Sequence, residues 1–197
     1  MPHKAFGFVD GGYVRKRASE AGADLINPRA LIQRIVNLPL LQGWCATPQT
    51  VQNVGAARVI YYDARPDNDT EISEDLKEYW DAVELLEDTD LGFGSMRGGT
   101  TKKPPRQKGV DTLIAVDMLV GSFTKLFAVA ILVAGDADFV PILNEVRRQG
   151  VMVVVAAWEK STSADLKRAA DRFLPLEPFS DTACVPPLIV DGRRWKA

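Results

Sequence analysis

The sequence predicts an α/β fold in which helices cover both faces of a mainly parallel sheet. Segments typical of strands and segments typical of helices alternate along the 197 residues, as they do where crossover helices connect parallel strands. Residues 128–136 and 151–158 are apolar almost throughout, as central strands are. The hydrophobic content of 46% is enough for one sizeable core, so we expect one domain with decorations.

The N-terminal residues predict a strand followed by a helix. Residues 5–10 are apolar and end at Asp10, after which Gly11 and Gly12 are expected to make a turn. The helix is expected to run from about Val14.

A second helix is expected to begin at Asn27 and Pro28, because asparagine is a favoured N-cap residue and proline is favoured in the first turn. Apolar residues at helical spacing between positions 31 and 36 predict its inner face. Residues 39–53 are expected to be an irregular insertion, and residues 57–64 to be the second strand.

The middle of the chain predicts two helices of different character. Residues 71–88, which follow the second strand and its Asp63, place apolar residues at helical spacing and acids elsewhere. This pattern predicts an amphipathic helix with a solvated acidic face. Residues 92–98 indicate a short extended piece. The helix that begins near Asp111 is very apolar and is expected to be largely buried, so Asp117 is unexpected within it.

The C-terminal part predicts two central strands, each followed by a helix. The apolar strand 128–136 precedes a helix over 138–150 that ends at a glycine. The apolar strand 151–158 precedes a final helix over 163–176.

The last residues are Pro-rich and carry exposed apolar side chains, which distinguishes them from the segments before them. We therefore expect a domain of residues 1–177 and a tail of residues 178–197. The tail is expected to pack across the domain or onto a second subunit of a homodimer.

Composition excludes several classes of protein. No apolar run is long enough to cross a membrane and the N-terminus has no signal-peptide layout, so we expect a soluble, cytoplasmic protein. Cys45 and Cys184 form no paired motif, which argues against a zinc site or a disulfide framework. His3 is the one histidine of the sequence, which argues against Ser-His-Asp and Cys-His chemistry.

Positive charge is concentrated in one stretch of a chain whose net charge is −2. Residues 97–108 contain no acid, and their glycines and prolines predict an exposed, irregular loop. The basic residues of this stretch are Arg97, Lys102, Lys103, Arg106 and Lys108. The loop is expected either to hold a phosphate backbone or to be a solvated linker.

Aspartates lie where a parallel sheet would present them to a ligand. Asp10 and Asp136 end predicted strands, and Asp111 starts a predicted helix. Open parallel sheets bind ligands beyond the carboxyl ends of their strands. Gathered carboxylates need protons or a cation to offset their charge, and hard oxygen ligands suit Mg²⁺ or Mn²⁺. The sequence therefore predicts a metal-dependent acidic site.

Two further aspartates each have two interpretations. Asp138 lies two residues after Asp136 and is expected either to join the site, directly or through water, or to cap the following helix. Asp117 lies six residues after Asp111, about 600° of helical rotation, so the two do not share a face. It is expected either to reach the site along the cleft or to form a buried polar contact.

Five motifs in this order carry a family resemblance: FVDGGY, YYD, QKGVDTLIAVDML, ILVAGDADFVPILNEVRRQG and SADLKRAADRFLPL. From about Phe6 to Leu176 the chain resembles the NYN domain, the group of PIN-like nucleases that includes the bacterial LabA-like (DUF88) proteins. The resemblance implies a three-layer α/β/α PIN-like fold whose acidic cluster binds Mg²⁺ or Mn²⁺ and cleaves RNA.

The resemblance also assigns residues. Asp10 matches the first-strand aspartate of the family, Asp111 the aspartate of its KGVD motif, and Asp136 and Asp138 the two acids of its SGD-type motif. The chain departs from the family at Tyr13, where asparagine is common. Either the tyrosine hydroxyl takes the place of that amide or the site is altered.

Three functions are consistent with these residues. The first is a metal-dependent ribonuclease in which Asp10, Asp111 and Asp136 hold the ion and the basic residues of 97–108 position single-stranded RNA. The second is an RNA-binding or regulatory module without turnover, which Tyr13 and the acidic net charge favour. The third is another phosphohydrolase, because a fold does not determine a reaction.

Overall fold

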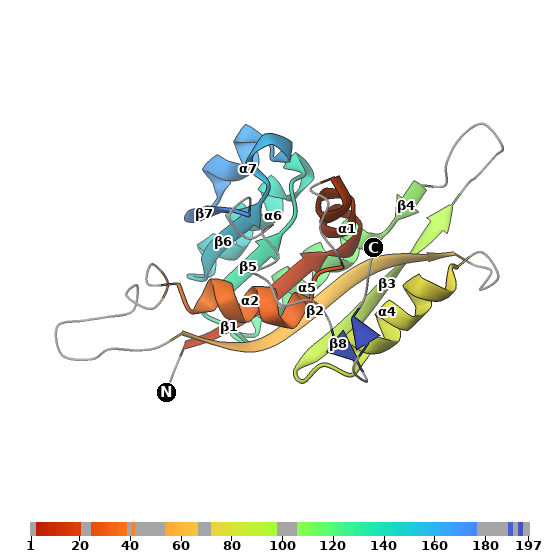
Figure 1. Ribbon diagram of the computed structural model, residues 1–197. Helices are drawn as coiled ribbons and strands as arrows, with labels where there is room; N and C mark the ends of the chain where they lie inside the picture. The colour runs from red at the N-terminus through yellow and green to blue at the C-terminus, as the bar shows by residue number, and fades with distance from the viewer. Residues whose placement is uncertain are drawn as a thin grey trace.

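The computed structural model describes residues 3–20, 25–38, 41, 54–66, 72–97 and 106–176, with two short strands at 189–190 and 193–194. Within these residues, one seven-stranded sheet has the order β4-β3-β2-β1-β5-β6-β7 (Figure 1). Its strands are β1 (His3–Asp10), β2 (Val54–Pro66), β3 (Thr89–Arg97), β4 (Arg106–Lys108), β5 (Val129–Val133), β6 (Met152–Ala157) and β7 (Arg172–Pro175). All neighbouring pairs are parallel except β3 and β4. The predicted α/β fold with a mainly parallel sheet is confirmed.

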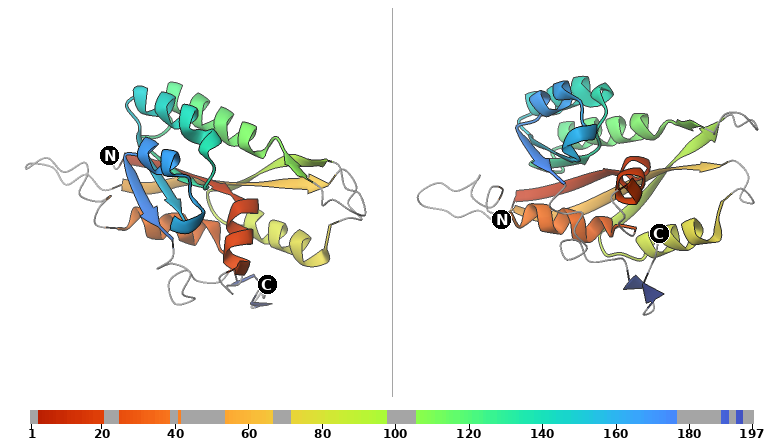
Figure 2. Two further views of the ribbon diagram at one scale, coloured as in Figure 1. Left: turned by 90° about the horizontal axis from the view of Figure 1, so that it is seen from above. Right: turned by 45° about the horizontal axis from the view of Figure 1, so that its top comes forward.

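Helices cover both faces of the sheet, which makes three layers (Figure 2). One face packs against α1 (Gly11–Glu20), α2 (Pro28–Val36) and α4 (Glu74–Glu84), and the other against α5 (Val110–Phe123), α6 (Val140–Arg148) and α7 (Ala164–Ala169). Because side chains alternate along a strand, each strand contributes to both hydrophobic cores. Tyr61 lies in the first core and its neighbour Tyr62 in the second.

The order of the strands creates a reversal point beside β1. The chain runs from β1 to β2 and β3 in one direction, and α5 then returns it to the opposite side of β1 as β5. β1 and β5 are parallel neighbours, paired from Ala5 with Val129 to Val9 with Val133. Ligands of doubly wound sheets bind in the crevice at such a point, outside the carboxyl ends of the strands.

Local capping explains where two of the helices begin. The side chain of Asn27 accepts a hydrogen bond from the Ala30 N–H at 2.9 Å, and Pro28 occupies the first turn of α2, as predicted. The side chain of Ser73 caps α4 in the same way. The acidic residues of α4 are exposed while its Tyr79 and Trp80 are buried, which confirms the amphipathic helix.

The first helix begins earlier than the sequence predicts. α1 starts at Gly11, directly after β1, so the two glycines belong to the helix and make no separate turn. The ring of Tyr61 lies against Gly11, where a Cβ atom would be 2.3 Å from the Tyr61 Cζ. Glycine is needed here for close packing of α1 on β2.

Two predictions about helices are wrong. α5 is not largely buried, because Val116, Val120 and Phe123 lie on its outer side and are 49–57% exposed. The predicted helix over 163–176 stops at Ala169, and its last part forms the edge strand β7, which pairs with β6.

The basic stretch is only partly an irregular loop. Arg97 ends β3 and pairs with Arg106 of β4 in antiparallel register. Residues 98–105 lie outside the described part of the chain, as do residues 39–53 except Leu41.

The tail lies largely outside the described residues too. Its described part is a pair of antiparallel strands, β8 (Ile189–Val190) and β9 (Arg193–Arg194). Its packing and the domain boundary at 177 remain predictions. None of the helices in the described ranges is long and apolar enough to cross a membrane.

Candidate functional site

The carboxyl ends of β1 and β5 bring Asp10 and Asp136 to one cavity. Asp10 is the last residue of β1, and Asp136 follows the end of β5 at Val133. Both line a cavity of about 750 Å³. The other lining residues are Gly12, Tyr13, Lys16, Arg17, Gln107, Gly135, Ala137, Ser161 and Ser163. The sheet thus joins two acids that lie far apart in the sequence.

The Asp10 side chain accepts a hydrogen bond from the backbone, yet its surroundings disfavour its negative charge. Its Oδ1 accepts a hydrogen bond from the Tyr13 N–H at 2.9 Å, which caps the first turn of α1. Burial nevertheless raises the pKa of Asp10 from 3.8 to about 6, and the negative charge of Asp111 contributes to the rise. The Asp10 carboxylate would therefore gain from a nearby cation.

Asp111 connects the acids electrostatically. It lies in the first turn of α5, after Gly109 in the left-handed conformation with φ 88°. Desolvation raises the pKa of Asp111, and the charges of Asp136 and Asp138 raise it further. Since Asp111 also acts on Asp10, the four predicted acids form one interacting group.

Asp136, and not Asp138, is the capping residue. The Asp136 Oδ1 accepts a hydrogen bond from the Asp138 N–H at 3.2 Å and caps the short 3-10 helix η2 (Ala137–Phe139). No side chain caps α6, which follows it. The interpretation of Asp138 as a helix cap is therefore wrong, and its carboxylate is exposed to solvent.

The acids suit a hard cation by their chemistry, since carboxylate oxygens are the ligands that Mg²⁺ and Mn²⁺ prefer. Their side chains are nevertheless not gathered as a ready-made cage. In the described ranges, no three or more His, Cys, Asp and Glu side chains are grouped so as to hold a metal ion.

The Tyr13 side chain does not take the place of the asparagine amide that is common in the family at this position. Its hydroxyl accepts a hydrogen bond from the Trp158 N–H at 3.0 Å and lies 3.0 Å from the Ser161 Oγ. Its ring packs edge-on against Trp158. Asp10 is instead held by the backbone N–H of Tyr13, a contact that any residue at this position can make except proline.

Asp117 lies away from the cavity of Asp10. It accepts a hydrogen bond from the Tyr62 hydroxyl at 2.8 Å and lines a different cavity of about 350 Å³. Of the two interpretations, the polar contact agrees with this geometry, although Asp117 is exposed and not buried. Burial and this contact raise the pKa of Tyr62.

Among the predicted basic residues, the structure describes the side chain of Lys108, which does not line the cavity of Asp10 and Asp136. Lys108 lines a neighbouring cavity of about 590 Å³ with Arg65 and Phe93, next to the start of α5. Lys102 and Lys103 lie outside the described residues, and only the backbones of Arg97 and Arg106 are described. Whether this stretch binds RNA therefore remains a prediction.

Two cations that sequence reasoning missed do line the cavity, Lys16 and Arg17 of α1. Their signal in the sequence is the basic run VRKRAS, which directly follows the first of the five motifs. They lie one turn beyond Tyr13 on α1 and line the same cavity as Asp10 and Asp136.

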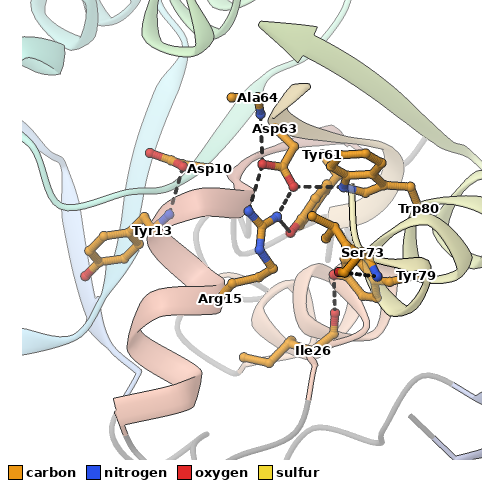
Figure 3. Close-up of polar contacts among 11 residues, drawn as sticks. Asp10, Tyr13, Arg15, Ile26, Tyr61, Asp63, Ala64, Ser73, Tyr79 and Trp80 are labelled. Atoms are coloured by element: carbon orange, nitrogen blue, oxygen red, sulfur yellow. Dashed lines mark hydrogen bonds and ion pairs between the residues drawn. The ribbon is translucent and has the colours of Figure 1, made fainter. Parts of the chain in front are cut away.

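A second acid of the sheet, Asp63, is fully buried and neutralised (Figure 3). Arg15 of α1 forms an ion pair with it, and the second Arg15 nitrogen donates to its Oδ1 at 3.0 Å. The Trp80 Nε1–H donates to its Oδ2 at 2.8 Å, and the Ala64 N–H to its Oδ1 at 2.8 Å. Figure 3 shows that Tyr13 and Arg15 leave α1 in different directions, so this network is separate from the cavity.

The fold is a three-layer α/β/α domain with acids at the reversal point of its sheet. The chain belongs to the NYN domain family, whose model matches residues 7–177, and NYN domains are part of the PIN-like superfamily. The resemblance inferred from the sequence motifs is thus confirmed for the family and the fold, and the chain is a member of a PIN-like nuclease family.

Among solved structures, the chain is similar to a protein of unknown function from Vibrio parahaemolyticus. The two share 16% sequence identity with a TM-score of 0.63, over 89% of this chain and 94% of that protein. At this identity the likeness supports the fold alone. No curated protein matches the sequence.

Proposed function

We propose that this protein is a metal-dependent ribonuclease that hydrolyses RNA phosphodiester bonds at Asp10, Asp111, Asp136 and Asp138. The observation that supports the proposal is the convergence of acids from three chain segments on the reversal point of the sheet. Burial and the repulsion between their negative charges raise the pKa values of Asp10 and Asp111, so a bound cation would stabilise the ionised carboxylates. Membership of a PIN-like nuclease family favours RNA as the substrate.

Asp10, Asp111 and Asp136 would hold Mg²⁺ or Mn²⁺, and Asp138 would join them directly or through water. Such an ion supplies a bound water of lowered pKa and stabilises charge on the phosphate. Asp111, Asp136 and Asp138 are exposed, so rotation about their side-chain bonds can bring their oxygens together. Asp10 is fixed by its bond to the Tyr13 N–H, and would serve as the rigid ligand.

We further propose that Lys108 and the other cations of residues 97–108 hold the backbone of single-stranded RNA beside these acids. The cavity of Lys108 also contains Phe93 and adjoins Gly109, two residues before Asp111. Cations and an aromatic side chain are what an unpaired strand needs, for its phosphates and for its bases.

A second function, an RNA-binding module without turnover, is favoured by two observations. The Tyr13 hydroxyl is bound to the Trp158 N–H and lies beside the Ser161 Oγ, so the Tyr13 side chain does not take the place of the amide common in the family. Within the described residues, the carboxylates are also not preassembled around an ion.

The experiment that separates these functions measures Mn²⁺-dependent cleavage of single-stranded RNA. Asp10→Asn and Asp136→Asn should each lower the rate at least about 100-fold, because each removes a charged metal ligand. Asp75→Asn is the matched control, since Asp75 is an exposed acid in the first turn of α4, remote from the cavity.

Ion binding provides a second measurement that does not depend on turnover. Mn²⁺ at 100 times its dissociation constant should stabilise the wild type by about 2.7 kcal/mol, and should stabilise the Asp10→Asn variant less. A wild type that binds Mn²⁺ yet leaves varied RNAs intact would favour the binding module. Activity that survives both substitutions would refute the proposed site.

A further inference from the structure

Two cations of α1 give the acidic cavity a wall of opposite charge. Lys16 and Arg17 line the same cavity as Asp10 and Asp136. They follow Asp10 by six and seven residues, about 10 Å along a helix axis. Helical side chains lean toward the N-terminus of their helix, so these two lean back toward the acids.

Lys16 and Arg17 differ in how far their hydrogen-bonding groups are already engaged. Lys16 is exposed and has no ion pair or hydrogen bond among the described residues. One Arg17 nitrogen, Nη1, binds Glu20 at 2.6 Å. The Arg17 Nε is buried and finds no acceptor in the described part of the chain. A buried donor without an acceptor is uncommon in folded proteins.

Neutral hydroxyl and amide groups complete the polar lining of the cavity. Ser161 and Ser163 reach the cavity from the segment between β6 and α7, and Gln107 reaches it from β4. Two cations with neutral hydroxyl and amide groups form a surface that suits a phosphate, whereas the acids repel one. The lining of the cavity therefore combines acids, which suit a cation, with cations and neutral polar groups, which suit a phosphate.

We propose that Lys16 and Arg17 form a phosphate subsite, which binds a backbone phosphate of the RNA strand next to the one that is cleaved. This inference rests on the proposed ribonuclease function for the identity of the strand. It adds a role for residues outside the acidic cluster and outside the basic stretch 97–108. Because the contact is electrostatic and involves no ion, it persists when metal is removed.

The test measures binding of a single-stranded RNA oligonucleotide by fluorescence anisotropy in EDTA, where no metal-dependent cleavage occurs. The double substitution Lys16→Ala and Arg17→Ala should weaken binding about tenfold. It should also reduce the slope of log affinity against log salt by roughly 0.7 to 1.4, the value for one or two phosphates on a single strand. The charge-conserving double substitution Lys16→Arg and Arg17→Lys should retain the affinity and the salt slope of the wild type.

The matched control is the double substitution Lys77→Ala and Arg148→Ala. It removes the same two charges from exposed positions on α4 and α6 that do not line this cavity, and Arg148 pairs with Glu145 as Arg17 pairs with Glu20. The control should bind RNA as the wild type does. Equal weakening in both pairs would assign the effect to net charge and overturn the subsite.

The outcomes for this subsite and for the ribonuclease are separate. RNA cleavage that is lost in Asp10→Asn, together with unchanged binding by the Lys16 and Arg17 variant, would refute the subsite and retain the ribonuclease. Weakened binding in a protein that never cleaves would retain the subsite and refute the ribonuclease. A circular dichroism spectrum equal to that of the wild type excludes misfolding as the cause of weaker binding.

Discussion

Asp10 and Asp63 lie at almost the same level of two neighbouring strands, yet only Asp10 faces an open cavity. The register of β1 and β2 pairs Asp10 with Tyr62, so Asp63 lies one residue further along. Because side chains alternate along a strand, Asp63 points to the face of Tyr61, where α1 and α4 pack. Asp10 points to the same face of the sheet as Tyr62, its partner on β2. This is the face on which α5 packs, and Asp111 of α5 acts on Asp10 by its charge.

The surroundings of the two acids follow from this difference of one residue. On the face of α1 and α4, Arg15 and Trp80 supply an opposite charge and a donor to Asp63. On the other side, the start of α5 supplies Asp10 with a further negative charge, that of Asp111. An acid with complete partners stabilises the fold, whereas an acid with like-charged neighbours suits the binding of a cation.

The largest expected effect is the loss of Asp63. Asp63→Ala should lower the free energy of unfolding by about 3–5 kcal/mol, because it leaves the Arg15 guanidinium and the Trp80 N–H without their acceptor. Urea denaturation measures the change. Replacing the pair together, as Asp63→Leu with Arg15→Met, should recover most of the loss, since no buried charge then remains unpaired. A loss below about 1 kcal/mol would contradict the structural role of this pair.

The contrast between the two acids shows which features a sequence can predict. Asp10 and Asp136 could be predicted because each follows an apolar strand, and parallel strands bring their carboxyl ends together. Asp63 follows an apolar strand too, and nothing in the sequence indicates that Arg15 and Trp80 enclose it. Its role depends on the register between β1 and β2, which is a property of the tertiary fold.

Other errors have the same origin in tertiary contacts. Residues 163–176 have a helical pattern, but β6 has an open edge, and residues 172–175 pair with it as β7. The Asp171 Oδ2 accepts a hydrogen bond from the Val153 N–H at 2.8 Å and fixes that turn. The outer side of α5 is apolar in sequence and exposed in the fold, so composition alone could not indicate its burial.

The next largest effect is expected for Asp10, where removal of the charge should raise the free energy of unfolding, whereas the loss of Asp63 lowers it. The pKa of Asp10 is about 6 in the folded protein and 3.8 in its ordinary state, so the folded state disfavours ionisation. Above pH 6 the ionised carboxylate lowers the free energy of unfolding by on the order of 2–3 kcal/mol. Below about pH 4 the effect is absent, because the carboxyl group is then protonated in the folded and the unfolded protein. Asp10→Asn keeps an acceptor for the Tyr13 N–H and removes the charge. The variant should therefore be more stable than the wild type at pH 8, and the gain should vanish as the pH falls to 4.

Urea denaturation across this pH range, in EDTA, measures the Asp10 effect without a bound ion. Asp63→Asn provides the comparison, because it removes a charge that has an Arg15 partner. That variant should be less stable than the wild type at pH 8. If Asp10→Asn were also destabilising at pH 8, the two acids would have the same kind of environment, and the distinction between them would be wrong.

The smallest expected effect is that of Asp117→Asn, which tests where the site ends. Asp117 is exposed, binds the Tyr62 hydroxyl and lines a cavity other than that of Asp10. Asparagine retains an acceptor for that hydroxyl, so the free energy of unfolding should change by less than about 1 kcal/mol. The stabilisation of the folded protein by Mn²⁺ and the rate of RNA cleavage should match those of the wild type, because no carboxylate of the cavity is altered. Should Asp117→Asn lose Mn²⁺-dependent cleavage as Asp10→Asn does, the acidic site would extend along α5 beyond Asp111, and the polar contact with Tyr62 would be only part of its role.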